Sequence, residues 1–364
     1  MEEVKEKEKR SIGFKILIII LILIIILISV FVIYWCKNSY SYDWNLKTTY
    51  NAGFVEKDFK LKDNSIIHYA QGPKNGTPLL MIHGQCASWK TYTACLPTLS
   101  KNYTVYVVDC YGHGQSSHNP KKYNANTMGK DLDYFIKNVI KEKTIVTGHS
   151  SGGLLAAYLG ANSNEVLGVI LEDPPFFSCE DNRKKDTWNY NDTSTICNNY
   201  LKQDESKDFT LYYFENSLSL TFMGQDAKKF FVNYAKNYRK DHPNKRLVVG
   251  FLPQSFMGVY DDMDTYDPKF GETFYNGDFN KNFDHATILS NIKCPAVLIH
   301  ASHKISEDGM LQGAMTEADA KKANKLIPNC YIRHSNAIHA VHSLDTKNFI
   351  DIVNEFVEKN NLNK

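Results

Sequence analysis

The sequence has no excess of charge of either sign. Its 364 residues carry 42 Lys and Arg against 40 Asp and Glu, which gives a formal net charge of +2. A basic surface field of the kind that attracts nucleic acid is therefore excluded, and we expect no nucleic-acid partner. The sequence also lacks a Gly-rich dinucleotide fingerprint, a phosphate-binding loop and metal-ligand spacing, so we expect no cofactor and no metal.

Paired cysteine spacing is missing as well. The eight cysteines are scattered, and no two of them form a C-x-x-C pair. A chain of this length does not need a disulfide framework, so we expect most of the cysteines to be buried as small apolar side chains. If the main domain lies outside the cell, one or two disulfides could form, but the spacing indicates no particular pairing.

One segment departs from this average composition. Residues 14–35 are almost wholly apolar, with Lys15 as the exception. A run of about 20 such residues crosses a bilayer as a helix, whereas a cleaved signal peptide has a shorter apolar region followed by small residues. We predict an uncleaved transmembrane helix over residues 14–35, a short tail over residues 1–13 and a linker over residues 36–52.

The basic residues around this segment predict its orientation. Only Lys37 follows the apolar run closely, whereas five basic residues precede or open it, namely Lys5, Lys7, Lys9, Arg10 and Lys15. Cytoplasmic flanks of membrane helices are enriched in Lys and Arg. We therefore expect a cytoplasmic N-terminus, a main domain on the extracytoplasmic side, and Tyr34 and Trp35 as aromatic anchors at the far interface.

From residue 54 onward, strand-like and helix-like segments alternate. Residues 54–61 and 65–70 read as a hairpin, and buried strand runs follow at residues 78–82, 103–109, 144–147 and 166–171. This alternation predicts an α/β fold with a mostly parallel central sheet and helices on both faces. The strand runs stop after Asp173 and return at residue 295, which predicts a helical insertion over residues 178–290 between two core parts, residues 53–177 and 291–364.

The stretch TIVTGHSSGG, residues 144–153, places a serine between glycines at the junction of two segments. A β-branched run precedes the serine, and an apolar, alanine-rich run follows it. In a sharp strand-to-helix turn the residues two positions either side must be small, and Gly148 and Gly152 meet that demand for Ser150. The G-x-S-x-G pattern in this context predicts that the Ser150 hydroxyl stands above the sheet edge, beside the unpaired N–H groups of a helix N-terminus.

Several motifs follow one another in a familiar order. They are His83-Gly84-Gln85 with Trp89, the turn Asp109-x-x-Gly112-His113-Gly114-x-Ser116, the elbow around Ser150, the insertion, and a late His339. With these motifs, residues 50–360 resemble the α/β-hydrolase superfamily, in its lipase, esterase and haloalkane-dehalogenase-like branch. Residues 172–177 and 311–315 are similar to segments of a bacterial subgroup. The resemblance implies the α/β-hydrolase fold, with a helical cap inserted after the sixth strand and, in this chain, a membrane anchor in front.

The resemblance also implies roles for individual residues. Ser150 would be the nucleophile of an acyl-enzyme, and the backbone N–H groups of Gln85 and Ser151 would form the oxyanion hole. The general base would be a histidine of the C-terminal segment, where His339 and His342 compete. His339 is favoured because it follows the last strand directly, whereas His342 is expected at the opening of the last helix. His83 and His113 are expected to brace loops.

The acid of the triad is harder to place. Many relatives carry an aspartate shortly after the penultimate strand, but this sequence has Lys304 there, and lysine cannot orient an imidazolium. Asp173 at the end of the preceding strand is the favoured acid, because a strand end holds a carboxylate better than a loop does. Glu307 and Asp308 are the alternatives. Glu172 is expected to point to the other side of its strand.

These residues lead to a functional expectation. We expect a membrane-tethered serine hydrolase that cleaves a carboxylic ester with an apolar part, and whose aromatic cap roofs the pocket. The same triad could act on amides, thioesters or carbon–carbon bonds, or transfer an acyl group to an acceptor other than water. A non-catalytic binding protein on the same scaffold is a further alternative, because one fold hosts many functions. The sequence indicates neither the natural substrate nor the oligomeric state.

Overall fold

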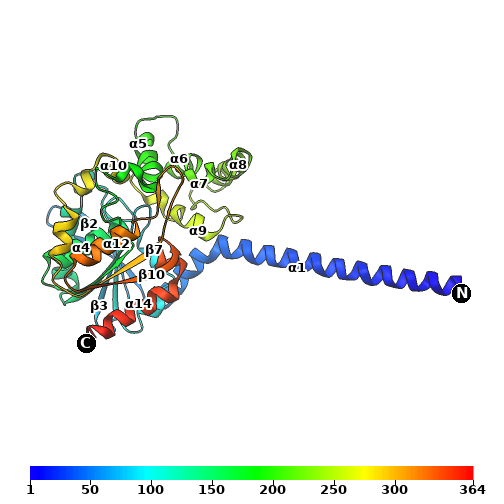
Figure 1. The fold of residues 1–364 in the computed structure, drawn as a ribbon, viewed down its shortest axis with the longest axis horizontal. Helices are drawn as coiled ribbons and strands as arrows, with labels where there is room; N and C mark the ends of the chain where they lie inside the picture. Colours follow the sequence, from blue (N-terminus) through cyan, green and yellow to red (C-terminus); the bar gives the residue numbers. More distant parts are fainter. Residues whose placement is uncertain (364) are drawn as a thin grey trace.

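An eight-stranded sheet forms the centre of the protein in the computed structural model, which describes residues 1–363 (Figure 1). The strand order is β1-β2-β4-β3-β5-β6-β7-β10. The first two strands, β1 (Val55–Lys60) and β2 (Ile66–Gln71), form the predicted hairpin, and β2 also pairs antiparallel with β4. The other strands run parallel, namely β3 (Pro78–Ile82), β4 (Thr104–Val108), β5 (Thr144–His149), β6 (Val166–Glu172), β7 (Ala296–Ser302) and β10 (Cys330–Ile338).

Alternate residues of the buried strands feed two separate cores. In β3, Leu80 and Ile82 enter one core, whereas Leu79 and Met81 enter the other. The first core includes side chains of α3 (Ala125–Phe135), α4 (Ser151–Asn162) and α12 (Glu317–Leu326), and the second those of α2 (Leu96–Leu99), α13 (Val341–Leu344) and α14 (Thr346–Lys359). Both faces of the sheet are therefore covered, as parallel strands with continuous apolar runs require. The predicted fold is confirmed.

The insertion between β6 and β7 is largely helical, as predicted. Its helices are α5 (Thr195–Tyr200), α6 (Phe209–Asn216), α7 (Leu218–Thr221), α8 (Gln225–Asp241), α9 (Gln254–Met257), α10 (Pro268–Asn276) and α11 (His285–Ser290). Side-chain caps define several starts; for example, Asp208 accepts a hydrogen bond from the amide of Leu211 at the start of α6. Phe209, Tyr213 and Phe214 are buried in the same hydrophobic core as α3 and α4, so many aromatic residues of this cap serve as core packing.

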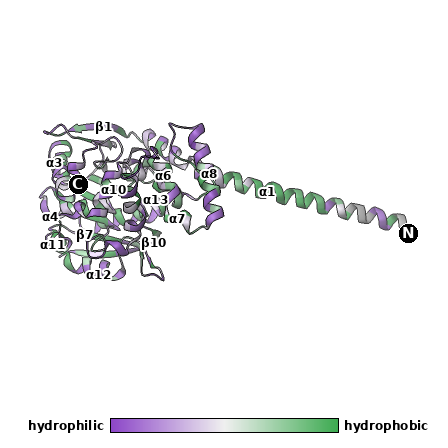
Figure 2. Cartoon of the chain, turned by 90° about the horizontal axis from the view of Figure 1, so that it is seen from above, coloured by the Kyte–Doolittle hydropathy of each residue, from purple (hydrophilic) through white to green (hydrophobic). Residues whose placement is uncertain are grey.

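The N-terminal helix is longer than the sequence indicates. A single helix, α1 (Glu2–Asn51), projects from the domain, and none of its apolar stretch is buried within the structure (Figures 1 and 2). Residues 36–51, expected to belong to a linker, continue this helix. They contain neither Gly nor Pro, and the domain holds them: Tyr42 donates a hydrogen bond to Asp262 over 2.6 Å, and Arg246 donates one to the carbonyl of Ser39 over 2.6 Å. These contacts stabilise a helical conformation where composition alone suggests a loop.

Candidate active site

The turn between β5 and α4 has the geometry of a nucleophile elbow. Ser150 has φ 53° and ψ −121°, a strained conformation for a residue with a side chain. A Cβ on Gly148 would lie 2.1 Å from the carbonyl oxygen of Gly152, and a Cβ on Gly152 would lie 2.3 Å from the carbonyl oxygen of Ile82. Both positions therefore require glycine, as predicted from the spacing around Ser150.

The strained turn is fixed from both sides. The amide of Ser150 donates to the carbonyl of Glu172 over 2.9 Å, and the amide of Gly153 donates to the carbonyl of Ser150 over 2.9 Å. Ser151, the first residue of α4, is buried. The serine hydroxyl therefore sits at the N-terminus of a 12-residue helix, where backbone N–H groups stabilise negative charge.

A carboxylate and an imidazole meet at the carboxyl ends of β6 and β10, which lie on either side of β7. Nδ1 of His339, just beyond β10, lies 2.7 Å from Oδ2 of Asp173, just beyond β6. The Asp173 side chain is buried, whereas the side chain of His339 is 36% exposed. With Nδ1 protonated toward the carboxylate, Nε2 is left as the proton acceptor on the accessible side of the ring.

Asp173 is held in its ionised form by several donors. The amide of Ala301 donates to its Oδ1 over 3.2 Å, and Nδ1 of His300 lies 3.6 Å from the same oxygen. Burial by itself would raise the pKa of Asp173, but the nearby His300 imidazole and the hydrogen bonds from His339 and the Ala301 amide outweigh it and hold the pKa below its usual range. The group is thus suited to orient a histidine and to stabilise its protonated form.

The imidazole of His339 lies beside the elbow. Its ring centroid is 4.5 Å from that of His149, the residue directly before Ser150. Burial, followed by the charges of His339 and His342, lowers the pKa of His149 well below its usual value, so this ring stays neutral. Ser150, Asp173 and His339 all have positive φ, at 53°, 43° and 60°. Such strained residues cluster at functional sites.

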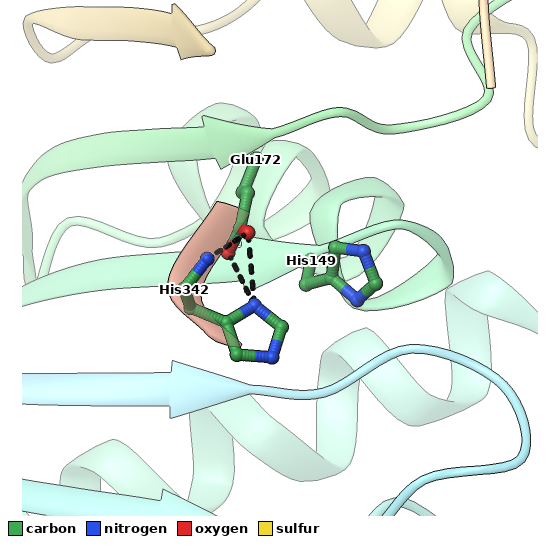
Figure 3. A group of neighbouring side chains, drawn as sticks. All are labelled: His149, Glu172 and His342. Carbon is green, nitrogen blue, oxygen red and sulfur yellow. Dashed lines mark hydrogen bonds and ion pairs between the residues drawn. The ribbon is translucent and has the colours of Figure 1, made fainter. Parts of the chain in front are cut away.

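Glu172 and His342 form a second acid–histidine pair beside His149 (Figure 3). The carboxylate of Glu172 accepts from the backbone amide of His342 over 2.8 Å and from Nδ1 of the same residue over 2.8 Å. Nε2 of His342 lies 3.0 Å from the hydroxyl of Thr91, which serves as the donor. Both side chains of the pair are fully buried. His342 lies in the short helix α13, which precedes the last helix α14, and not at the opening of the last helix as predicted. It does not bond to Asp173.

His149, Glu172 and His342 are also a possible ligand set for a metal. Their ligand atoms lie within 4.8 Å of one another. However, the carboxylate of Glu172 and both ring nitrogens of His342 already have hydrogen-bond partners. Glu172 and His342 are therefore satisfied as a hydrogen-bonded pair, whereas Nε2 of the neighbouring His149 is buried without a hydrogen-bond partner among the described residues.

The loop after β3 approaches the elbow closely. A Cβ on Gly84 would lie 3.0 Å from the Cβ of Ser150, so Gln85, the next residue, is adjacent to the elbow. The Gln85 side chain donates to Asn189 over 3.1 Å and accepts from Tyr266 over 3.4 Å. Because Asn189 and Tyr266 belong to the cap, Gln85 links the loop to the roof of the site.

His83 and Asp109 brace this loop from below. Nδ1 of His83 donates to the carbonyl of Gly84 over 2.7 Å, and its Nε2 accepts from the amide of Cys110 over 2.9 Å. Burial lowers the pKa of His83 to about 4. Asp109 accepts from the amides of Trp89 and Gln115. The loop next to the elbow is thus held rigidly, as preorganised oxyanion donors require.

The alternative acids lie elsewhere. Glu307 and Asp308 are exposed on the turn between β8 (Lys304–Ile305) and β9 (Leu311–Gln312), a small hairpin that the sequence does not predict. Asp308 accepts from the hydroxyl of Ser306, and Lys304 is exposed on β8. The structure therefore places Asp173 next to His339. It places neither Glu307 nor Asp308 there.

A cavity of about 850 Å³ lies between α1, the cap and the core. Its lining includes Trp35, Tyr42, Trp89 and Arg246 but not Ser150, Asp173 or His339. This space is therefore separate from the serine elbow.

Comparison with known proteins identifies the family. Residues 77–343 match the family described as alpha/beta hydrolase fold, and the chain belongs to it. The chain is 33% identical over 101 residues to the magnesium-chelatase 30 kDa subunit of Rhodobacter capsulatus, covering 27% of this chain and 36% of that protein. It is 28% identical over 101 residues to the soluble epoxide hydrolase of Corynebacterium sp. (strain C12), covering 28% of this chain and 35% of that protein. The chain thus spans about a third of the length of these curated relatives.

Solved structures share the fold over a larger part of the chain. A bacterial membrane phospholipase A superposes with a TM-score of 0.58 at 15% sequence identity, covering 94% of this chain and 98% of that one. At this identity the similarity concerns the fold alone. Since the names of the relatives differ in activity, the reaction has to be argued from the site.

Sequence reasoning missed three contributors to this site. It did not predict the bond of Glu172 to His342, the approach of His300 to Asp173 or the contact of His149 with His339. One signal was present: two consecutive acids, Glu172 and Asp173, precede two histidines spaced by three residues. That spacing is compatible with two parallel acid–histidine pairs, but it does not reveal which acid meets which ring.

Proposed function

We propose that this protein is a serine hydrolase that cleaves a carboxylic ester through an acyl-enzyme on Ser150. The observation that carries the proposal is the hydrogen bond between Asp173 and His339. The imidazole ring of His339 in turn contacts His149, the residue directly before Ser150. A buried carboxylate, an accessible imidazole and a strained serine are the parts that acyl transfer requires.

Each residue then has a distinct role. Nε2 of His339 takes the proton of the Ser150 hydroxyl as the oxygen attacks the ester carbonyl, and the backbone N–H groups of Gln85 and Ser151 stabilise the oxyanion. His339 then protonates the leaving alcohol, and the acyl group stays on Ser150. A water molecule, deprotonated by the same imidazole, attacks the acyl-enzyme, and the acid is released as His339 returns that proton to Oγ of Ser150. Asp173 stabilises the imidazolium throughout.

The cap supports an ester with an apolar part as substrate. Its residues Asn189 and Tyr266 contact Gln85 directly, so the cap lies over the loop that would hold the oxyanion. Apolar and aromatic walls with a few fixed polar groups are typical of small-molecule sites. The same geometry serves amides, thioesters and acyl transfer, which substrate screening separates.

The proposal includes a membrane anchor. The exposed apolar stretch of α1 is long enough to span a bilayer, and the fold similarity to the membrane phospholipase A extends over 94% of the chain, more than the globular domain alone. The basic residues before this stretch favour a cytoplasmic N-terminus and an extracytoplasmic catalytic domain. The full chain should stay in the membrane fraction after an alkaline carbonate wash; release into the supernatant would contradict the anchor.

A fluorophosphonate probe tests the catalytic part of the proposal. The wild-type chain should be labelled, Ser150→Ala should lose all labelling, and Ser290→Ala, at an exposed serine of α11, should be labelled like the wild type. Hydrolysis of p-nitrophenyl esters of graded chain length should disappear in the same variant. Absence of labelling in the folded wild type would overturn the proposal and favour a binding role.

A further inference from the structure

The cap exposes a group of large apolar side chains next to α1. Phe222, Met223, Phe230 and Phe251 are 67%, 40%, 58% and 37% exposed. Phe222 and Met223 lie between α7 and α8, and Phe230 lies on α8. Side chains of this size are normally buried, and a group of exposed ones on and around a single helix, here α8, marks an interaction surface. We call these four residues the cap patch.

One residue of the cap patch, Phe251, contacts the apolar stretch of α1. The ring of Phe251 stacks on that of Phe31 with centroids 6.1 Å apart, and the hydroxyl of Tyr34 donates to the carbonyl of Phe251 over 3.3 Å. On its other side, the ring of Phe251 meets that of Tyr234 at 5.4 Å. Phe230 precedes Tyr234 by four residues and so shares its face of α8.

The position of Phe31 along α1 indicates how deep the cap patch would lie in a bilayer. Phe31 lies four residues before Trp35, which ends the apolar run. Four residues correspond to about 6 Å along a helix. If α1 spans a bilayer, Phe251 therefore lies at the boundary between headgroups and acyl chains. Helices that lie flat on membranes bury their apolar side chains about 5–10 Å into this boundary.

The charges on α8 suit the same surroundings. Lys229, Lys236 and Lys240 are exposed on this helix, and Lys236 lies 3.0 Å from Glu215, a pair that leaves its side chain half exposed. Asp226 and Asp241 are the acidic residues of α8. Exposed lysines beside phenylalanines are the composition of interfacial helices that bind anionic lipid. In Figures 1 and 2, α8 lies at the end of the domain from which α1 leaves.

We propose that the cap patch and α8 dock on the surface of the bilayer that α1 enters. Phe222, Met223, Phe230 and Phe251 insert between lipid headgroups, while Lys229 and Lys240 contact anionic headgroups. The membrane thereby becomes part of the surroundings of the cap, and the cap contacts the oxyanion loop through Asn189 and Tyr266. This inference rests on the proposed anchor but not on the proposed ester chemistry.

A fluorescent probe at position 230 tests the docking. The full chain, with Cys36→Ser and Cys330→Ser because these are the two cysteines that are not buried, receives Phe230→Cys and an environment-sensitive label. It is reconstituted into vesicles of phosphatidylcholine and phosphatidylglycerol. The matched control is Lys130→Cys, an exposed position on α3 at the opposite end of the domain (Figure 2).

The label at position 230 should show blue-shifted emission and lose fluorescence when the lipids carry bromine, whereas the label at position 130 should do neither. Adding Phe222→Ser, Lys229→Glu and Lys240→Glu to the Phe230→Cys chain should reduce this quenching. Equal, weak quenching at both positions in a chain that floats with the vesicles would overturn the docking and leave the anchor intact. A chain that does not float with the vesicles would overturn the anchor and the docking together, while probe labelling of Ser150 still reports on catalysis.

Discussion

His339 and Asp173 are 166 residues apart in the sequence, yet their side chains are joined by a 2.7 Å hydrogen bond. The two residues follow β10 and β6, which flank β7 in the sheet. Because these strands are parallel, their carboxyl ends lie at the same edge, where α/β sheets place their ligand sites. Because only β7 separates β6 from β10, Asp173 and His339 come close enough to belong to one candidate triad.

Replacing Asp173 should remove most of the activity without unfolding the protein. Asp173→Asn keeps the shape of the side chain but no longer stabilises the imidazolium, and an equivalent change in a serine protease lowers kcat by about 10⁴. Ester hydrolysis by purified variants measures this effect. Asp308→Asn, on the exposed hairpin turn, should behave like the wild type, and near-normal turnover of Asp173→Asn would show that another acid serves His339.

The pair of Glu172 and His342 should contribute to stability. Glu172→Gln keeps one acceptor for the two donors of His342, so we expect a loss of about 1–3 kcal/mol. Thr91→Val, which removes the partner of the second ring nitrogen, should cost about 1 kcal/mol. Urea titration of the detergent-solubilised full chain measures both values. Unchanged stability of Glu172→Gln would mean that the pair contributes nothing to the free energy of folding.

The glycines of the elbow should not tolerate a methyl group. In Gly152→Ala the new Cβ would meet the carbonyl oxygen of Ile82 at 2.3 Å, so the strand-to-helix turn has to shift. Overpacking of this kind costs about 1–3 kcal/mol and occasionally more, and a displaced Ser150 should also lose activity. In Gly258→Ala the nearest atom is 3.8 Å away, and this control should retain the thermal midpoint and the probe labelling of the wild type. Similar behaviour of the two variants would contradict the steric argument.

Buried His285 should make the protein less stable in mild acid. Nδ1 of His285 accepts from the amide of Phe177 over 2.8 Å, and burial lowers the pKa of this histidine from 6.5 to about 4. Between these values the unfolded chain binds a proton that the folded chain does not, so stability falls as the pH falls. The contribution is about 2 kcal/mol between about pH 7 and about pH 5.

The variant His285→Gln isolates this contribution. The glutamine oxygen can accept the same amide but takes up no proton, so the pH dependence of its unfolding free energy should be shallower than in the wild type. Asp109 and Asp261, whose pKa values are raised to about 6 and about 7 by burial, act in the opposite direction. Both aspartates remain in the variant, so their contributions to the pH dependence cancel when the two proteins are compared. Parallel pH profiles for the two proteins would contradict this account of His285.

Local sequence signals predict much of the fold because they act over a few residues. The apolar runs indicate buried strands at β3, β5 and β7. The glycines around Ser150 indicate a tight turn. The continuation of α1 through residues 36–51 was not predictable in this way. Its polar side chains become helical because the cap, more than 200 residues later, supplies partners such as Arg246 for Ser39 and Asp262 for Tyr42.

The sequence by itself determined that a serine stands in a tight turn that requires glycine two positions before and after it, and that an apolar helix precedes an α/β domain. Local sterics and hydrophobicity set both. Only the tertiary structure decided which carboxylate meets which histidine, because Glu172 and Asp173 are neighbours on one strand and His339 and His342 are three residues apart. The register of β6, β7 and β10 directs Asp173 to His339 and Glu172 to His342, and strand register depends on contacts across the whole sheet.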